Sequence, residues 1–287
     1  MTDIFDVIVV GGGMAGLSTA YHLARLGART LLLQAGDLGS GSSAACAGRA
    51  QTAEGHLDPL NLQLIREGLA CFDTLEEELG TAFGWQRTNL LCLINSVSLW
   101  DAWVERARIL TVAGIPVRLL DLPELQAAEP HLNPAGFLGA AHAVEGLVNP
   151  FLFCWAYARA ARRLGAILRS HTPVTTMRVE SRRVVAVEAG NERFLTDRVA
   201  IMCGAWTARV ARLAGAAVPI HHTHAEAFVT EPVSLPLENT IEMADFYETI
   251  HGKARAVSVG FNRGMNGGLV VTEAVTQTGE LHRRTSA

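Results

Sequence analysis

Three glycines near the start of the chain have the spacing of a dinucleotide-binding turn. Gly11, Gly13 and Gly16 form a G-x-G-x-x-G pattern between an apolar run, residues 7–10, and a helix-forming stretch, residues 17–26. A strand, glycine turn and helix in this order bring backbone N–H groups and the positive end of a helix dipole to a pyrophosphate. A tight turn without a ligand is the alternative, but the flanking pattern favours a dinucleotide site.

The residues after the second strand decide which dinucleotide is expected. That strand, residues 30–33, ends at Gln34, where the motif normally has an acidic residue for the adenosine ribose. An amide can still bind the ribose hydroxyls, but without a charge-assisted hydrogen bond. Residues 36–51 then form a long segment rich in glycine, serine and alanine. Such a segment favours backbone lying along an extended cofactor, with a flexible surface loop as the alternative.

Composition excludes several classes of protein. The 287 residues are 49% hydrophobic and carry a net charge of −4, which argues against a nucleic-acid-binding role. No apolar run approaches the roughly 20 residues of a membrane span, and the N-terminus has no signal-peptide pattern. The five cysteines are dispersed without a C-x-x-C motif, which favours reduced thiols, most of them in the core. We therefore expect a cytoplasmic protein.

Several further motifs resemble one family. The sequence is similar to the FAD-dependent amine and amino-acid oxidoreductases of the D-amino-acid oxidase superfamily in five segments, residues 6–28, 31–48, 145–166, 171–177 and 200–215, and more weakly in residues 219–232. This group includes glycine oxidase, sarcosine oxidase and flavoprotein subunits of proline, hydroxyproline and opine dehydrogenases. The resemblance covers most of residues 4–232, and it implies FAD that is held without a covalent bond.

The resemblance also implies which residues contact FAD. It places Gly11, Gly13, Met14, Ala15 and Gly16 at the pyrophosphate, Gln34 and Ala35 at the ribose, Ser42, Ser43, Cys46, Ala47 and Gly48 beside the diphosphate and flavin ring, Val174 at the adenine, and Gly204 and Trp206 over the cofactor. Two positions depart from the family pattern. Gln34 replaces an acidic residue, and Cys46 stands where a polar or small residue is common. A small buried side chain is the favoured interpretation of Cys46, with a redox role as the alternative.

Arg49 is the candidate for binding a substrate carboxylate. Oxidation of an amine by flavin needs the neutral amine, its α C–H directed at flavin N5, and a group that holds the carboxylate. A guanidinium binds a carboxylate through two hydrogen bonds. Arg49 directly follows residues 36–48, which we call the flavin loop because the resemblance places part of it beside the flavin ring. A surface or phosphate-side arginine is the favoured alternative. The expected reaction is oxidation of the C–N bond of a small amino acid or secondary amine by hydride transfer to flavin N5, giving an imine.

Two histidines are further candidates at the substrate site. His222 and His224 would share one face of a strand, with His221 on the other. Ordinary strand residues are the favoured interpretation, and lining of the substrate pocket is the next. No metal site is predicted, because two imidazoles do not complete one, although Glu226 continues the same face.

The expected fold class is α/β (α+β overall), with a Rossmann-like FAD-binding βαβ domain interleaved with an antiparallel-sheet substrate domain. The predicted domains are residues 1–50 and 144–215 for FAD, 51–143 and 216–273 for the substrate, and a tail over 274–287. Hydrophobic periodicity and caps predict helices over 60–79, 100–112 and 151–164, and a short helix after Asp121. Strands are predicted over 89–95 and 194–203, and a hairpin over 174–188. Extended runs are predicted over 221–230, 240–250, 256–259 and 268–273.

The C-terminal part of the sequence limits the functional prediction. After Gly215 no strand-turn-helix pattern recurs, whereas the family returns to its FAD sheet and covers the flavin. We therefore expect these 287 residues to bind FAD weakly and to act poorly on amino acids without a partner subunit or a further segment. An incomplete or non-catalytic FAD-binding subunit that needs a partner chain, and a nicotinamide-dinucleotide-binding protein, stay open as alternatives. The pattern does not distinguish oxidase from dehydrogenase.

Overall fold

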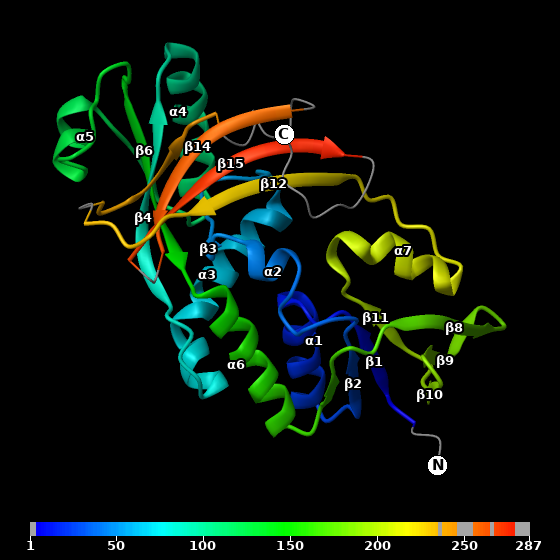
Figure 1. The fold of residues 1–287 in the computed structure, drawn as a ribbon. Helices are drawn as coiled ribbons and strands as arrows, with labels where there is room; N and C mark the ends of the chain where they lie inside the picture. The colour runs from blue at the N-terminus through cyan, green and yellow to red at the C-terminus, as the bar shows by residue number, and fades with distance from the viewer. Residues whose placement is uncertain (1–3, 235–236, 246–254, 265–266, 279–287) are drawn as a thin grey trace. The chain divides into compact units, whose positions relative to one another are not determined.

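The structure is a computed structural model that describes residues 4–234, 237–245, 255–264 and 267–278 (Figure 1). The chain forms two compact units. Unit 1 contains Met1–Cys46, Leu75–Phe83 and Asn149–Ile220, and unit 2 contains Ala47–Thr74, Gly84–Val148 and His221–Ala287. Residues 47–50 and 144–148, which the sequence analysis assigned to the FAD domain, thus lie in unit 2. The end of a long helix, α3 (Pro59–Leu79), contributes to unit 1.

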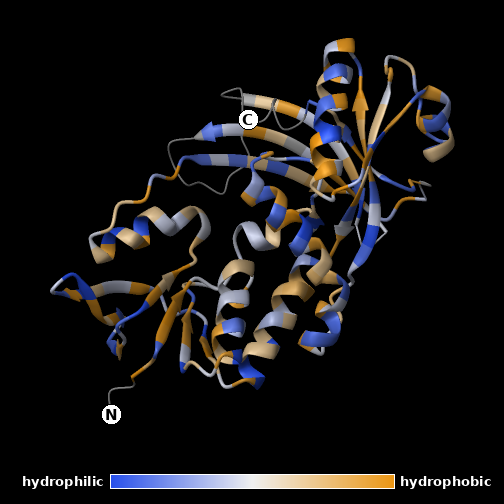
Figure 2. Ribbon diagram, turned by 180° about the vertical axis from the view of Figure 1, so that it is seen from behind, coloured by the Kyte–Doolittle hydropathy of each residue, from blue (hydrophilic) through white to orange (hydrophobic). Residues whose placement is uncertain are grey.

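The centre of unit 1 is a four-stranded parallel sheet in the order β11-β1-β2-β7. Its strands are β1 (Val7–Val10), β2 (Thr30–Leu33), β7 (Ile167–Arg169) and β11 (Val199–Ile201). The four residues of β2 are all buried, as are Ile8, Val9 and Val10 of β1, and these strands are coloured hydrophobic in Figure 2. Burial on both faces explains why these strands are continuous apolar runs rather than alternating ones.

Two helices of unit 1 pack together through small side chains. They are α1 (Met14–Arg25) and α6 (Pro150–Arg163). Ala20 of α1 and Ala156 of α6 are fully buried, and such small residues let helix backbones approach closely. The side chain of Asn149 accepts hydrogen bonds from the first N–H groups of α6, and Pro150 occupies the first turn. The predicted start of this helix at Asn149-Pro150 is confirmed.

A second sheet of unit 1 corrects one predicted strand. Strands β8 (Val174–Glu180), β9 (Arg183–Ala189) and β10 (Glu192–Leu195) form an antiparallel sheet in the order β10-β9-β8. The single strand predicted over 194–203 is therefore wrong, since β10 and β11 belong to different sheets. Thr196 causes the break, because its hydroxyl accepts from the N–H of Arg198 at 3.2 Å and donates to that residue's carbonyl at 2.9 Å. Three further elements complete unit 1: η1 (Gly204–Trp206), α7 (Thr207–Ala211) and η2 (Arg212–Ala214).

Unit 2 is built on an eight-stranded sheet. Seven strands follow the order β12-β15-β14-β13-β4-β6-β3, and β5 also pairs with β6. They are β3 (Arg49–Ala50), β4 (Gln86–Ile94), β5 (Val117–Leu120), β6 (Gly139–Leu147), β12 (His222–Val229), β13 (Thr240–Met243), β14 (Arg255–Arg263) and β15 (Leu269–Thr278). The pair β13–β4 is parallel, which corrects the expectation of an antiparallel sheet throughout. Residues 274–278, predicted as tail, belong to β15, and 246–250 lie outside the described residues.

Helices cover the sheet of unit 2 and complete its cores. One face carries Leu90 and Ile94 of β4, which pack with Trp103 and Leu110 of α4 (Val97–Val112). On α5 (Leu122–Ala128), Asp121 and Glu124 form the capping box that the sequence predicts near Asp121. Among the described residues, none of the helices has both the length and the hydropathy needed to cross a membrane.

Candidate functional site

The glycine turn has the geometry of a pyrophosphate cradle. Gly11 has a φ of +110°, and a Cβ at that position would lie 2.3 Å from the carbonyl oxygen of Met202. A Cβ at Gly16 would lie 1.9 Å from the carbonyl oxygen of Gly11, so helix α1 passes too close to the turn for any side chain. Gly13 caps α1, and no acidic residue occupies the first turn of that helix. The positive end of the helix dipole is therefore available to an anion.

Gln34 and Ser43 connect two neighbouring loops to this turn. The Oε1 of Gln34 accepts from the N–H of Gly12 at 2.8 Å, and its Nε2 donates to the carbonyl of Asp37 and the hydroxyl of Ser40, both at 3.2 Å. The hydroxyl of Ser43 accepts from the N–H of Met14 at 3.0 Å. The structure thus brings Gln34 and Ser43 to the glycine turn. The amide of Gln34 stabilises the turn by hydrogen bonds that connect it to residues 37 and 40.

Replacing Gln34 with glutamate is expected to retain FAD binding or to tighten it by up to about 1.5 kcal/mol, because a carboxylate accepts the Gly12 N–H and a ribose hydroxyl more strongly than an amide. The carbonyl of Asp37 keeps a donor, since the Ser40 hydroxyl donates to it at 2.7 Å. Fluorescence titration of the apoprotein with FAD measures the effect. Gln34→Leu is the control, and it should weaken binding because it leaves the buried Gly12 N–H without its acceptor. A large loss of affinity in Gln34→Glu would show that this side chain faces a phosphate or a neighbouring carboxylate rather than the ribose, or that the turn requires the Nε2 donor to Asp37 and Ser40.

The other predicted FAD contacts are divided between the two units. Those in unit 1 are Ala15, Ala35, Ser42, Cys46, Val174, Gly204 and Trp206, and those in unit 2 are Ala47 and Gly48. Trp206 lies against the flavin loop, since a Cβ at Gly41 would be 3.5 Å from its ring. In unit 2, the carbonyl of Gly48 accepts from the N–H of Val148 at 2.8 Å. The segment that leaves the flavin loop is therefore fixed to the sheet of unit 2.

The cysteines near the flavin loop differ in exposure. Cys46 is exposed, which corrects the favoured interpretation of a small buried side chain. Cys154 of α6 is buried, and burial raises the pKa of its thiol to about 11. Burial also raises the pKa of Cys203 to about 11, and its Sγ donates to the carbonyl of Val10 at 3.1 Å. Both thiols are therefore protonated at neutral pH and serve as packing groups.

Arg49 has a different set of partners from the substrate carboxylate that the sequence analysis considered. Its Nη2 lies 2.7 Å from Glu145 Oε2 and 3.2 Å from Glu54 Oε1, and its Nη1 lies 2.6 Å from Glu242 Oε2. Its Nε also donates to Glu145 at 3.0 Å. The side chain of Arg49 is 9% exposed, so these carboxylates occupy a guanidinium that is almost closed to solvent. We name this group of four side chains the Arg49 cluster, and we do not retain the carboxylate-clamp role.

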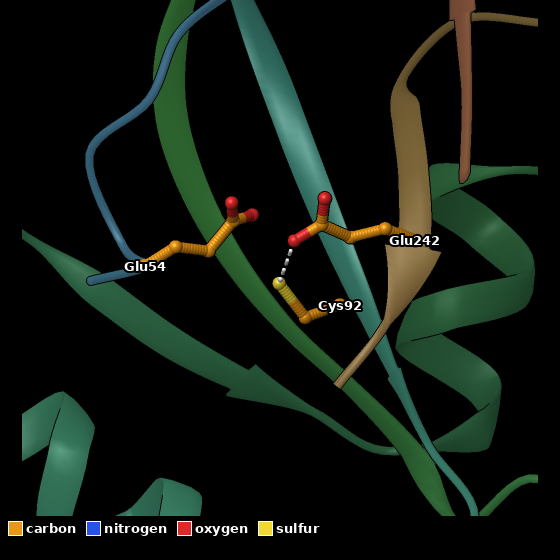
Figure 3. A group of neighbouring side chains, drawn as sticks. All are labelled: Glu54, Cys92 and Glu242. Carbon is orange, nitrogen blue, oxygen red and sulfur yellow. Dashed lines mark hydrogen bonds between the residues drawn. The ribbon is translucent and has the colours of Figure 1, made fainter. Parts of the chain in front are cut away.

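Cys92 extends the Arg49 cluster on the same face of the sheet. Glu54, Cys92 and Glu242 point toward one another in Figure 3, and the thiol of Cys92 lies 3.5 Å from Glu242 Oε1. In the part of the chain that the structure describes, this is the one group of three potential metal ligands that converges. The neighbouring guanidinium of Arg49 opposes a cation there, because it already binds an oxygen of each carboxylate.

The histidines of β12 alternate as predicted. His222 and His224 are half-buried, as is Glu226, whereas His221 is exposed. These histidines are not part of the converging group around Cys92. Their role at a substrate pocket remains a prediction.

Sequence reasoning missed the acidic partners of Arg49. Glu145 and Glu242 are 0% and 1% exposed, and each stands in a strand whose other residues are mostly apolar. A carboxylate within such a run is a signal for a buried ion pair, because charged residues are rarely buried without a partner. Glu145 also lies directly before the Gly-Leu-Val-Asn-Pro segment that the family resemblance includes.

Comparisons with known proteins agree on one family. The family model described as "FAD dependent oxidoreductase", DAO, matches residues 6–278. Human mitochondrial sarcosine dehydrogenase is 29% identical over 267 residues, which cover 89% of this chain and 28% of that protein. Sarcosine oxidase subunit beta of Rhodobacter capsulatus is 27% identical over 257 residues, covering 86% of this chain and 60% of the relative. Glycine oxidase of Geobacillus kaustophilus superposes with a TM-score of 0.82 at 27% identity, covering all of this chain and 75% of that structure.

The relatives are longer than this chain. The chain spans 28% of the length of human sarcosine dehydrogenase and 60% of the length of the Rhodobacter sarcosine oxidase subunit. Each of these matches therefore covers one part of the relative, whereas the family model covers both the glycine turn and the strands of unit 2 in this chain.

Proposed function

Because the chain belongs to the DAO family of FAD-dependent oxidoreductases, we propose that it holds FAD without a covalent bond on the glycine turn of unit 1 and oxidises the C–N bond of a small amino acid or secondary amine. The observation that carries this proposal is the cradle at Gly11, Gly13 and Gly16, where backbone oxygens leave no room for a Cβ at Gly11 or Gly16 and where the first turn of α1 has no acidic residue. Sarcosine and glycine, the compounds in the names of the relatives, are both small amines with a carboxylate.

The residues of unit 1 supply binding and orientation. The N-terminal end of α1 faces the pyrophosphate, and Gln34 binds the ribose from the end of β2. Ser43 keeps the flavin loop beside the first turn of α1 through the Met14 N–H. FAD held by these residues would supply the two-electron acceptor that oxidation of the C–N bond to an imine requires.

On the substrate side, we propose His222 and His224 of β12 as pocket residues. They lie on the half-buried face of the strand, and the ring nitrogens of an imidazole can accept or donate a hydrogen bond to an amine. Their role would be to hold the amine in its neutral form before the C–H bond breaks.

A partner chain is the second part of the proposal. Sarcosine oxidase subunit beta is, by its name, a subunit of a larger enzyme, and this chain covers 60% of it. We propose that a second polypeptide or a further segment covers the flavin. FAD bound by an incomplete pocket would be more accessible to water, which lowers the rate of the reaction.

Anaerobic bleaching tests the proposal. The purified chain, saturated with FAD, is expected to be yellow and to lose its absorbance only slowly when sarcosine, glycine or proline is added without oxygen, and a co-purifying partner chain or a further segment is expected to speed this loss. A yellow protein that none of these amines bleaches, alone or with a co-purifying chain, would favour a non-catalytic FAD-binding subunit. A protein that takes up NAD but not FAD would favour the nicotinamide alternative and overturn the cofactor assignment.

A further inference from the structure

The Arg49 cluster has more negative than positive groups. Three carboxylates, Glu54, Glu145 and Glu242, bind one guanidinium, and all four side chains are less than 10% exposed. Fully ionised, the cluster would carry a net charge of −2 in a place closed to water. Like charges that share a buried site do not all ionise, because each additional charge loses hydration and repels the others.

Strand register explains how the cluster forms. Glu242 of β13 pairs directly with Cys92 of β4, and Cys92 pairs with Ala141 of β6, so these residues share one face of the sheet. Glu145 lies four residues after Ala141 on the same face, since side chains alternate along a strand. Arg49 pairs with Leu147 from β3 and reaches the same face. The cluster therefore occupies the edge of the hydrophobic core formed by Leu90, Cys92 and Ile94.

Geometry distinguishes the three carboxylates. Glu145 binds Arg49 through both oxygens, to Nε at 3.0 Å and to Nη2 at 2.7 Å, and this bidentate pair neutralises the guanidinium. Glu54 is the most exposed of the three, at 8%, and its Oε2 accepts from the side chain of Gln51. Glu242 is 1% exposed and meets Arg49 through a single oxygen. Glu242 is therefore the carboxyl group with the least compensation for its charge.

We propose that Glu242 is a buried carboxylic acid at neutral pH, and that with the Glu145–Arg49 pair it positions the segment leaving the flavin loop. The proton sits on Oε1. With an ionised Glu242 the thiol of Cys92 would donate to Oε1 across the 3.5 Å contact, whereas in the protonated form the direction is reversed and Oε1 donates to Sγ. Oε2 accepts from Arg49 Nη1 at 2.6 Å in either form. In this arrangement each contact of Glu242 joins one donor hydrogen to one acceptor atom, provided that the thiol hydrogen of Cys92 points away from Oε1. The positioning role rests on the proposed function, whereas the proton on Glu242 does not.

The groups around Glu242 support this protonation. Arg49 faces it from β3, Cys92 from β4, Glu145 from β6 and Glu54 from the segment after β3. On β14 the residue opposite Glu242 is Gly260, which offers no charge. Burial raises the pKa of Glu242, and the attraction of Arg49 opposes that rise without cancelling it.

The same cluster fixes the end of the flavin loop. Arg49 is the first residue of β3, three residues after Cys46, and its guanidinium is held by carboxylates from β6, β13 and the segment after β3. The side chain of Asn262 also donates to the carbonyl of Ala47 at 3.4 Å. Loss of the Glu145–Arg49 pair should therefore loosen the flavin loop. Neutralisation of Glu242 by substitution should not, because Glu242 is already neutral in the wild type under this proposal.

Two matched substitutions test the proposal. Glu242→Gln mimics the neutral acid, whereas Glu145→Gln removes the charge that neutralises Arg49. At pH 7, urea unfolding of the full chain should leave Glu242→Gln at least as stable as the wild type and make the unfolding equilibrium constant of Glu145→Gln at least roughly a hundredfold larger, about 2.7 kcal/mol. Equal destabilisation by the two changes would overturn the assignment of the proton to Glu242.

The pH dependence gives a second, independent result. The pKa of Glu242 is raised in the folded chain, so its protonated form contributes stability that is full below the unfolded pKa and is lost as the pH rises through the folded pKa. Between the unfolded and the folded pKa of Glu242, the wild type should therefore lose stability relative to Glu242→Gln by up to about tenfold in the unfolding constant per pH unit, and above the folded pKa this loss is complete. Infrared difference spectra between the two proteins should show one carboxylic-acid C=O band that shifts in D₂O. Parallel pH profiles and the absence of this band would overturn the proposal.

Flavin and metal measurements separate the remaining explanations. If the positioning role holds, Glu145→Gln releases FAD at least roughly tenfold more readily than Glu242→Gln, about 1.4 kcal/mol. If none of the proteins binds FAD, the proposed function fails while the stability and infrared results still decide the protonation. A rise in the wild-type unfolding midpoint with Zn²⁺ that is absent in Glu242→Gln would indicate a cation in place of the proton, and it would overturn the proposal.

Discussion

Replacement of Gly13 with valine is expected to weaken FAD binding by roughly a hundredfold or more, about 2.7 kcal/mol, while the chain stays folded. Gly13 has a φ of −81° and a ψ of −173°, an extended conformation that valine adopts without strain. A Cβ at this position would lie 2.8 Å from the hydroxyl of Ser43, and that side chain can rotate away. The new side chain would then fill the space that the pyrophosphate needs. Absorbance of the dialysed protein near the flavin bands measures the loss.

A second glycine substitution is the matched control. Gly16→Ala should instead destabilise unit 1 by about 3 kcal/mol, because its Cβ would lie 1.9 Å from a backbone oxygen that cannot rotate away. Circular dichroism and urea unfolding distinguish the two cases. Stoichiometric FAD in the Gly13→Val protein would show that the pyrophosphate lies elsewhere.

Replacement of Arg49 with methionine is expected to destabilise the chain by about 4 kcal/mol, because it removes the cation from two carboxyl groups that are almost inaccessible to water. Arg49→Lys should be intermediate, since an ammonium keeps the charge but cannot form the bidentate pair with Glu145. Urea unfolding at pH 7 measures both variants.

Arg87→Met is the control for this prediction. Arg87 also binds a carboxylate through two nitrogens, in this case Asp73 at 2.6 and 3.0 Å, but both side chains are more than 40% exposed. Exposed pairs contribute little, so this variant should unfold close to the wild-type midpoint. Equal effects of Arg49→Met and Arg87→Met would show that burial of the Arg49 cluster does not govern its contribution.

Local signals predicted the nucleotide-binding end of the fold. The strands at residues 7–10 and 30–33 lie where the sequence places them, because both are short apolar runs next to glycine or turn residues. The helices α5 and α6 begin at Asp121 and Asn149, since a side chain that caps the first N–H groups is visible in the sequence itself.

Long-range pairing explains what the sequence did not reveal. Strand β6 has the sequence GAAHAVEGL, whose glycines and alanines have low strand propensity, and it forms because β4, β3 and β5 pair with it. The partners of Arg49 were missed for the same reason. Glu145 and Glu242 are 96 and 193 residues away from it, and no local pattern connects them.

Unit 2 is assembled from segments that are far apart in the chain, and this limits the order in which its strands can pair during synthesis. Cys92 and Glu242 are neighbours on the sheet but 150 residues apart in the chain. At roughly 5–20 residues per second, translation separates them by roughly 8–30 s. Until β13 emerges, β4 is an unpaired edge at Leu91 and Leu93, a template for association with other chains. During this interval we expect the nascent chain to be more prone to association through β4 than the complete chain.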